Sequence, residues 1–179
     1  KCKIVSSGYI ILATSDWYGK DLLQIYNLNG EKIFETNLED KYYYVAPNEK
    51  YIIVTDNIKY ELIKYDINKG VKTIIPLGIN KGNIYAIYNA MFSKNCKSFL
   101  VKVYDKPNIV KLFLIFQNTL IWKKEYTRQE LRIDEMGPYF NFSNSGKYII
   151  YDNGVINIKN GKIIKKNITK EKLKQYMGE

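Results

Sequence analysis

The sequence predicts an all-β domain of four blade-like antiparallel β-meanders, followed by a short C-terminal helix. Three observations support this fold class. Short runs rich in β-branched and aromatic residues alternate with turns of Asn, Asp, Gly and Pro, a pattern typical of strands. These runs recur at intervals of about 40–50 residues, the usual length of a four-stranded propeller blade. Aromatic residues make up 15% of the chain, with 17 Tyr among them, and they suit strands that pack sheet against sheet.

Residues 46–78 display the repeat most clearly. Together with the residues just before them they hold four strand-like runs: 42–45 (YYYV), 51–56 (YIIVTD), 60–66 (YELIKYD) and 71–75 (VKTII). The turn at 47–50 contains Pro and Asn, and the turn at 68–70 ends in Gly. Asn and Gly tolerate the positive φ of tight hairpins, so consecutive runs are predicted to pair in an antiparallel way.

The same landmarks occur four times in the same order. The second run of each copy begins at an aromatic residue, at Tyr9, Tyr51, Phe99 and Tyr148, and these positions are 42, 48 and 49 residues apart. A polar turn precedes this run in each copy, and a turn containing Asn follows the third run. We therefore expect one domain over residues 1–179, with repeats at about 2–38, 42–77, 84–126 and 139–168.

Each of the other repeats also has four predicted strands. In the first repeat they are 3–5, 9–16, 22–28 and 32–36; in the third they are 84–92, 99–105, 110–116 and 120–126; in the fourth they are 139–142, 148–152, 155–158 and 162–168. Residues 78–83 read as a linker, and residues 127–137 as a charged loop or helical turn. Residues 169–177 predict the C-terminal helix, because Thr169 can cap it and Glu171 lies near its positive end.

Residues 142–164 (FSNSGKYIIYDNGVINIKNGKII) resemble the blade consensus of WD-repeat and TolB-like propellers. In those families a Phe-Ser-x-x-Gly-Lys turn precedes the second strand, and an Asn-Gly turn separates the third strand from the fourth. The resemblance implies a four-bladed ring or an arc of a larger propeller. The chain departs from the WD class because it has no Trp-Asp dipeptide and no His, so the buried His–Asp networks of that class are absent.

The composition excludes several chemistries. Without His, the catalytic triads that use His as a base and His-based zinc sites cannot form. Two Cys cannot supply a four-thiolate zinc site, and the sequence has neither a P-loop nor a Gly-x-Gly-x-x-Gly fingerprint. We therefore expect a protein that is not an enzyme and needs no metal or cofactor. A hydrolase that uses only carboxylates remains the third interpretation.

Four aspartates occupy equivalent positions, because each ends the second strand of its repeat: Asp16, Asp56, Asp105 and Asp152. One interpretation is an acidic rim that binds a cation or a basic partner. The other is that Asp begins turns, where its carboxylate accepts backbone N–H groups. Trp17 and Tyr18, in the turn after Asp16, are the aromatic candidates for a contact surface, whereas we expect Trp122 to belong to the core.

The chain is basic, with 28 Lys and Arg against 18 Asp and Glu, a net charge of +10. Seven lysines concentrate near the C-terminus: Lys159, Lys162, Lys165, Lys166, Lys170, Lys172 and Lys174. Such a patch can attract nucleic acid or an anionic surface. However, Arg128 and Arg132 are the only arginines, and recognition of bases and phosphates favours Arg. The alternative is a solvated surface rich in Lys.

The most economical functional prediction is a non-catalytic module that binds another protein or presents a ligand. The rival is a basic module that docks on nucleic acid or an anionic surface through the C-terminal lysines. No apolar run reaches the roughly 18–20 residues of a transmembrane helix. The first residue is Lys rather than Met, which favours a processed chain and an extracytoplasmic or secreted location. Cys2 and Cys96 lie two repeats apart and are not expected to pair.

Overall fold

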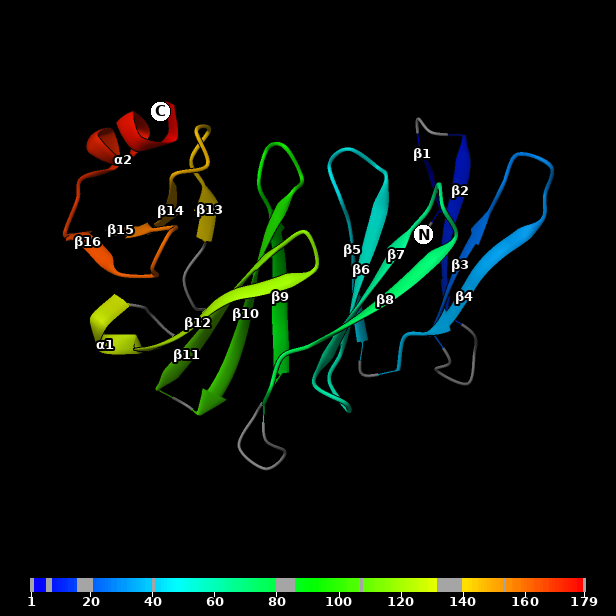
Figure 1. Ribbon diagram of the computed structural model, residues 1–179, viewed down its shortest axis with the longest axis horizontal. Helices are drawn as coiled ribbons and strands as arrows, with labels where there is room; N and C mark the ends of the chain where they lie inside the picture. Colours follow the sequence, from blue (N-terminus) through cyan, green and yellow to red (C-terminus); the bar gives the residue numbers. More distant parts are fainter. Residues whose placement is uncertain are drawn as a thin grey trace. The chain divides into compact units, whose positions relative to one another are not determined.

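The computed structural model describes residues 2–5, 8–15, 21–39, 41–79, 86–106, 108–131, 140–152 and 154–178. Over these residues the chain forms sixteen strands and two short helices (Figure 1). The strands make four separate four-stranded sheets, and in every sheet the spatial order of the strands follows the sequence. All pairs of neighbouring strands are antiparallel. The prediction of four antiparallel meanders is therefore confirmed.

The four sheets coincide with the four predicted repeats. The first sheet contains β1 (Cys2–Val5), β2 (Tyr9–Ser15), β3 (Asp21–Tyr26) and β4 (Lys32–Asn37). The second contains β5 (Lys41–Val45), β6 (Tyr51–Asp56), β7 (Glu61–Asp66) and β8 (Val71–Pro76). The third contains β9 (Ala86–Phe92), β10 (Ser98–Lys106), β11 (Ile109–Phe116) and β12 (Thr119–Thr127). The fourth contains β13 (Phe140–Phe142), β14 (Tyr148–Tyr151), β15 (Gly154–Asn157) and β16 (Ile163–Lys166).

Equivalent turns use the same backbone conformation. The turn before the second strand of each sheet has a residue with positive φ, at Gly8, Glu49, Cys96 and Gly146. The turn before the fourth strand has one as well, at Gly30, Gly70, Asn118 and Gly161. The repeat is therefore present in the backbone even where the residue is Glu or Cys, which adopt this conformation at a cost.

The chain divides into two compact units, Lys1–Pro76 and Leu77–Glu179, so the boundary falls between the second and the third sheet. In the N-terminal unit, the first and second sheets pack together through a cluster of buried residues: Ile11, Leu23, Ile25, Ile52, Val54, Ile63, Tyr65 and Ile67. The rings of Phe34 and Tyr65 lie 4.2 Å apart at this contact. The Tyr65 hydroxyl also donates a 3.0 Å hydrogen bond to the carbonyl oxygen of Ile33.

In the C-terminal unit, the third and fourth sheets share a larger core. Its buried members are Leu100, Val110, Leu112, Leu114, Tyr126, Leu131, Phe140, Phe142, Ile149, Tyr151 and Ile156. Trp122 is half-buried against this core, as the sequence predicts. The equivalent apolar positions of the second strands, Ile11, Ile53, Leu100 and Ile150, are all at most 6% exposed. The same position of each second strand is therefore buried, and in the fourth sheet Leu173 of the C-terminal helix covers it.

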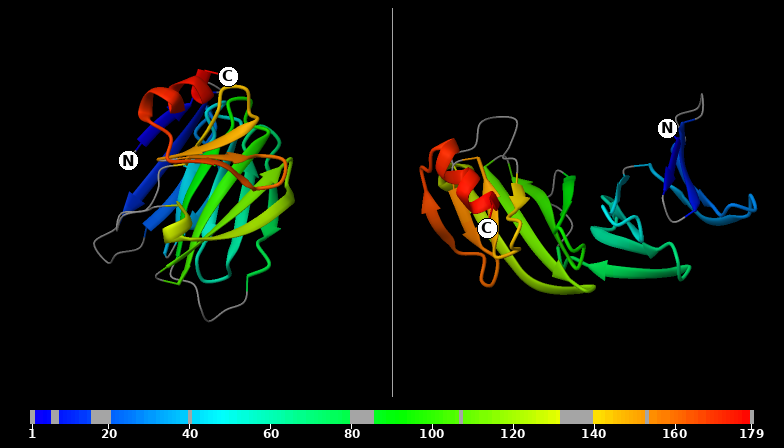
Figure 2. Two further views of the ribbon diagram at one scale, coloured as in Figure 1. Left: turned by 90° about the vertical axis from the view of Figure 1, so that its left-hand side faces the viewer. Right: turned by 90° about the horizontal axis from the view of Figure 1, so that it is seen from above.

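Two helices flank the fourth sheet in sequence. α1 (Arg128–Leu131) is a single turn in the charged connection, and it starts with a capping box. Thr127 Oγ1 accepts the Glu130 N–H at 3.0 Å, and Glu130 Oε2 accepts the Thr127 N–H at 2.8 Å. α2 (Lys170–Gly178) is the predicted C-terminal helix, and it lies against the fourth sheet (Figure 2). Its Leu173 packs onto Ile150 and Val155 of that sheet. Neither helix of the described chain is long and apolar enough to span a membrane.

Candidate functional site

Four of the predicted contact positions fall partly or wholly outside the described structure. Asp16, Trp17 and Tyr18 lie outside the described residues. Asp105 lies in β10, but its side chain is not among those described. The acidic rim formed by all four aspartates therefore stays a prediction, and two of its members, Asp56 and Asp152, can be placed.

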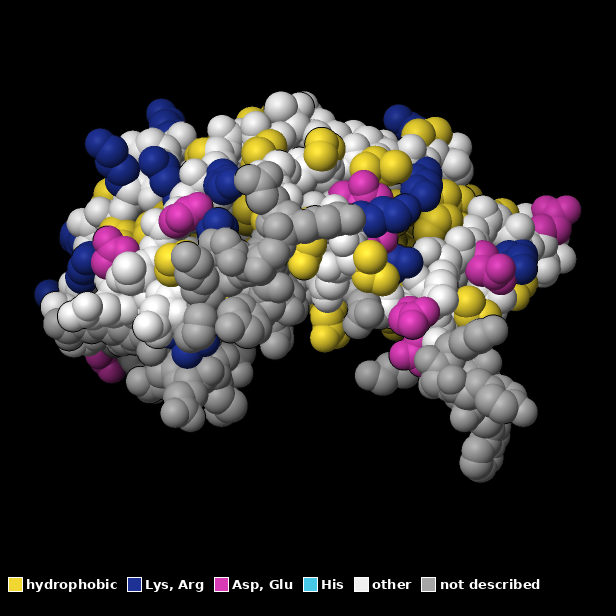
Figure 3. Space-filling model, turned by 90° about the horizontal axis from the view of Figure 1, so that it is seen from below, with side chains coloured by type: hydrophobic (Ala, Val, Ile, Leu, Met, Phe, Trp, Pro, Cys, Tyr) yellow, Lys and Arg dark blue, Asp and Glu magenta, His cyan; other side chains and the backbone are white. Residues whose placement is uncertain are grey.

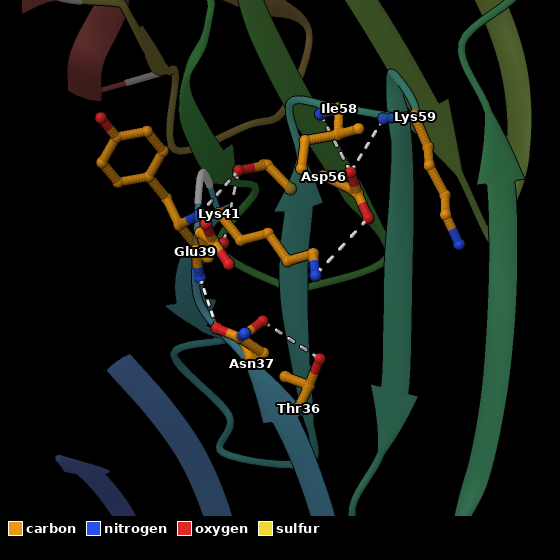
Figure 4. A network of polar contacts seen from close by, with 9 residues as sticks. Thr36, Asn37, Glu39, Lys41, Asp56, Ile58 and Lys59 are labelled. Carbon is orange, nitrogen blue, oxygen red and sulfur yellow. Dashed lines mark hydrogen bonds and ion pairs between the residues drawn. The ribbon is translucent and has the colours of Figure 1, made fainter. Parts of the chain in front are cut away.

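Asp56 ends β6 and binds its own turn. Its Oδ1 atom accepts the backbone N–H groups of Ile58 at 3.0 Å and Lys59 at 2.8 Å, and its Oδ2 atom lies 3.7 Å from Lys41 Nζ (Figure 4). The Asp56 side chain is 4% exposed. This is the geometry of a turn-forming aspartate, and Lys41 balances its charge.

Asp152 lies in a different environment, at the end of the fourth sheet's second strand. It is exposed, and its charge acts on Lys102 of β10. Lys102 is only 8% exposed; burial lowers the pKa of its ammonium group, while Asp152 acts in the opposite direction. Asp152 therefore helps to keep a buried lysine charged within the C-terminal unit.

Lys102 shares an aromatic neighbour with Arg128. The Lys102 Nζ atom lies 5.3 Å from the centre of the Tyr104 ring, and the Arg128 guanidinium carbon lies 5.5 Å from the same centre. Each distance lies within the roughly 6 Å over which an aromatic ring attracts a cation. Over the described part of the chain, no three His, Cys, Asp or Glu side chains gather in a way that could hold a metal ion.

The C-terminal lysines form the better-built site. A hollow of ≈ 380 Å³ between the end of β16 and helix α2 is lined by Lys165, Lys166, Asn167, Ile168, Lys172, Gln175 and Tyr176. We call it the basic groove. It brings together three of the seven predicted patch lysines. Lys159, Lys162 and Lys174 are exposed but do not line it, and the side chain of Lys170 is not described.

An irregular pairing of β15 with β16 positions Lys165. Val155 pairs with Lys165, but the next residue, Ile156, pairs with Ile163, so Ile164 is an extra residue in β16. A bulge of this kind re-aims the side chains on either side of it. Lys165 thereby shares a face with Val155, which packs beneath Leu173 of α2. Its Nζ atom lies 5.3 Å from the centre of the Tyr176 ring.

The other wall of the basic groove is held by α2. Asn167, with a φ of 59°, adopts the left-handed conformation and reverses the chain after β16. Thr169 Oγ1 then accepts the Lys172 N–H at 3.4 Å, at the beginning of the helix. Tyr176 packs edge-on against Tyr148, with ring centres 5.4 Å apart. The groove is therefore a product of secondary structure and not only of the local abundance of lysine.

The electrostatics of the basic groove favour an anionic ligand. Lys166 and Lys172 are exposed and have no acidic partner among the described residues. The first turn of α2, from which Lys172 projects, carries the positive end of the helix dipole. Elsewhere the charges are mixed: on the face shown in Figure 3, basic and acidic side chains lie next to each other in either part of the chain.

A second hollow of ≈ 310 Å³ occurs in the same unit, next to the last turn of α2. Phe92, Phe142 and Met177 supply its apolar lining, and its polar lining comes from Lys94, Asn141, Ser143 and Asn144. The Asn144 N–H donates a 3.2 Å hydrogen bond to the Met177 carbonyl, which fixes the end of the helix. Lys94 is the one charged residue in its lining, whereas three lysines line the basic groove.

Comparisons with known proteins bear on the fold. No protein-family model matches the sequence, and no curated protein matches it. Solved structures do match. TolB from Acinetobacter baumannii is 17% identical, with a TM-score of 0.50 over 91% of this chain and 42% of its own. Hsv2 from Kluyvelomyces marxianus is 12% identical, with a TM-score of 0.55 over 96% of this chain and 50% of its own.

An acylaminoacyl peptidase from Pyrococcus horikoshii also matches, at 10% identity and a TM-score of 0.54, over 89% of this chain and 30% of its own. The chain thus spans half or less of the length of these three structures. At such identities the likeness concerns the fold alone. It confirms the resemblance to propeller blades.

Sequence reasoning found the lysines of the basic groove but not the groove itself. Tyr148 and Tyr176 were missed because they are separated by 28 residues (176 − 148) and meet only when α2 folds onto the sheet. Asn167, between the last strand and a Thr cap, was the available signal for a chain reversal at this point.

Proposed function

We propose that this chain is a non-catalytic protein-interaction module of the propeller type, and that it binds an acidic segment of a partner protein in the basic groove. The observation that carries the proposal is the convergence of Lys165, Lys166 and Lys172 on one hollow of ≈ 380 Å³. A solvated lysine surface does not need a shaped recess. Here a bulge, a left-handed Asn and a capped helix all contribute to one.

The lining suits a carboxylate that lies beside apolar residues. Lysine is a compact point charge with three donors, and it pairs with single anionic oxygens without the two-point fork by which arginine binds carboxylate and phosphate. No arginine lines the basic groove. Gln175 and Asn167 add neutral hydrogen-bonding groups, and Ile168 and Tyr176 add apolar surface. A short peptide that carries Asp or Glu next to apolar residues matches this combination.

The net charge of the chain should speed the encounter with an acidic partner more than it strengthens binding. With a net charge of +10, the chain attracts acidic partners, but salt screens such fields beyond about 8 Å at physiological ionic strength. Binding that lasts therefore depends on contacts inside the basic groove. Surface ion pairs contribute about 0.2–1 kcal/mol each, so three lysines supply roughly 0.6–3 kcal/mol.

The second candidate function is docking on nucleic acid or an anionic surface. The observation that favours it is an aromatic ring, that of Tyr176, beside lysines in an open recess, since bases stack on such rings. However, Lys165 and Tyr148 already contact the Tyr176 ring. Less of the ring's surface is therefore open to a stacking base.

The test compares two variants of equal charge. The groove variant carries Lys165→Gln, Lys166→Gln and Lys172→Gln; the control carries Lys159→Gln, Lys162→Gln and Lys174→Gln. Binding of a fluorescent Glu-rich peptide and of a thymidine oligonucleotide is measured by anisotropy. We expect the groove variant to bind the peptide roughly 3- to 150-fold more weakly, and the control to bind like the unmodified chain. If both variants lose the same affinity for the peptide, binding depends on the net charge and not on the basic groove.

A further inference from the structure

β16 has an edge that no other strand of the described structure occupies. In the fourth sheet the order is β13-β14-β15-β16, so β16 pairs with β15 on one side only. Figure 1 shows β16 at the outside of this sheet. The last strand of a sheet presents a row of backbone N–H and C=O groups, and an extended peptide can add to such a row.

The last strands of the other three sheets differ from β16 in charge and chemistry. β4 pairs its Lys32 with Glu35 at 2.7 Å, so it is not basic. β8 ends at Pro76, which has no N–H to donate. β12 includes Glu125, which lies 3.0 Å from Lys111 of β11. β16 (IIKK) carries basic charge alone, and its Ile164 is 44% exposed.

We propose that the acidic partner of the basic groove binds as an extended strand along the free edge of β16. This inference rests on the proposed function and specifies the conformation and sequence pattern of the partner. Neighbouring side chains of an extended strand point to opposite faces of the sheet. Lys165 faces α2, and Lys172 projects from α2 into the same recess. Carboxylates at every second position of the added strand would therefore meet both lysines.

The opposing interpretation is that the edge lysines prevent pairing. Natural edge strands often carry Lys for this purpose. That interpretation predicts that β16 repels a neutral strand, and it gives no advantage to a strand with acidic residues on one face. It also does not account for the basic groove beside the edge, where the carboxylates of an added strand would lie close to the groove lysines.

The test uses a synthetic peptide of alternating Glu and Val and two derivatives with identical charge. One derivative has N-methyl groups on all Glu residues, and the other has them on all Val residues. Successive N–H groups of a strand point to opposite edges, so only one derivative blocks the edge that pairs with β16. We expect one derivative to bind about tenfold or more weakly than the parent peptide and the other to bind with a similar Kd.

The outcomes separate the inference from the proposed function. If both derivatives keep the affinity of the parent peptide, or both lose it equally, pairing with β16 is wrong while acidic binding in the groove stands. If the parent peptide itself does not bind, the proposed function fails too. Binding of a thymidine oligonucleotide that is lost in the groove variant would then favour the rival function. The control variant, with Lys159, Lys162 and Lys174 replaced by Gln, must behave like the unmodified chain in each arm.

Discussion

The hydroxyl of Tyr126 donates a hydrogen bond to the carbonyl oxygen of Gly161. Tyr126 belongs to β12 and Gly161 to the turn before β16, so this bond joins the third sheet to the fourth. Trp122 adds a second link, since its Nε1–H donates to the Ile158 carbonyl at 2.6 Å. Tyr65 plays the same part in the N-terminal unit, where it bonds to Ile33 of the first sheet. In each unit, an aromatic donor therefore ties one sheet to the backbone of its neighbour.

Replacing Tyr126 with Phe should destabilise the C-terminal unit by about 1–3 kcal/mol, because the Gly161 carbonyl loses its partner at a buried position. Urea unfolding measures the change. The control is Tyr42→Phe, since Tyr42 is 48% exposed and its hydroxyl can bond to water. Similar losses in the two variants would mean that the link between the sheets contributes nothing specific.

Alanine substitutions at Gly161 and Gly30 distinguish the cost of backbone strain from that of a steric clash. Both have a positive φ, of 67° and 80°, so an Ala at either position costs about 1–2 kcal/mol. A Cβ at Gly30 would meet no atom within 4 Å, whereas one at Gly161 would lie 2.5 Å from Lys124 Cγ and 3.3 Å from Trp122 Cε3. We expect Gly161→Ala to lose more stability than Gly30→Ala in thermal unfolding. Equal losses would show that the Lys124 side chain simply moves away.

Ile53 is fully buried in the centre of β6. Ile53→Ala should lower the free energy of unfolding by about 2–5 kcal/mol, through lost apolar burial and the cavity left behind. Ile58, in the adjacent turn, is 54% exposed, and Ile58→Ala is the matched control. A loss below about half a kcal/mol for Ile53→Ala would contradict the packing of this strand.

Asp56 permits a comparison of hydrogen bonding with charge. Asp56→Ala removes the acceptor of two backbone N–H groups and should cost about 1–3 kcal/mol. Asp56→Asn keeps an acceptor oxygen but loses the charge that faces Lys41, so it should retain more stability. Urea unfolding of both variants decides the point. If Asn is as damaging as Ala, the ion pair matters more than the turn.

Stability should decrease at alkaline pH. Burial raises the pKa of Tyr44 from 10.0 to about 12, and it raises the pKa of Tyr65, Tyr126 and Tyr151 as well. A group with a raised pKa stabilises the fold fully below its unfolded value, and this contribution is lost as the pH rises through the folded value. For Tyr44 this window is pH 10 to about 12.

Thermal unfolding measured across that pH window tests this prediction. With Tyr44→Phe, stability should fall less steeply with rising pH in that window. The lowered pKa of Lys102 has the opposite sign. The unfolded chain then binds more protons than the folded chain just below pH 10.5, so this lysine makes stability rise with pH up to that value. If the stability of Tyr44→Phe falls with pH as steeply as that of the unmodified chain, other groups control alkaline unfolding.

Local patterns were sufficient to predict the strands, their antiparallel order and the position of α2. The reason is physical: a β-meander pairs each strand with its neighbour in sequence, so turn residues such as Asn29 and Gly30 determine the pairing. The burial of Ile11, Ile53, Leu100 and Ile150 followed from the same alignment of repeats.

The site was predicted only in part because it depends on contacts between distant segments. The extra residue Ile164 leaves no mark in the sequence, yet it decides which way Lys165 points. The Tyr148–Tyr176 contact needs α2 to fold back onto β14. Asp56, by contrast, adopts the local turn geometry that its sequence position predicts as the alternative to a binding role.

The strict agreement between strand order and sequence order has a consequence for biosynthesis. Every backbone pairing in a sheet lies within a stretch of about 40 residues, so none needs a segment from the far end of the chain. A ribosome adds roughly 5–20 residues per second, whereas a β-hairpin forms in about 1–10 μs. The hairpins of one sheet can therefore form long before the next sheet has been translated, and no strand has to wait for a pairing partner from the far end of the chain.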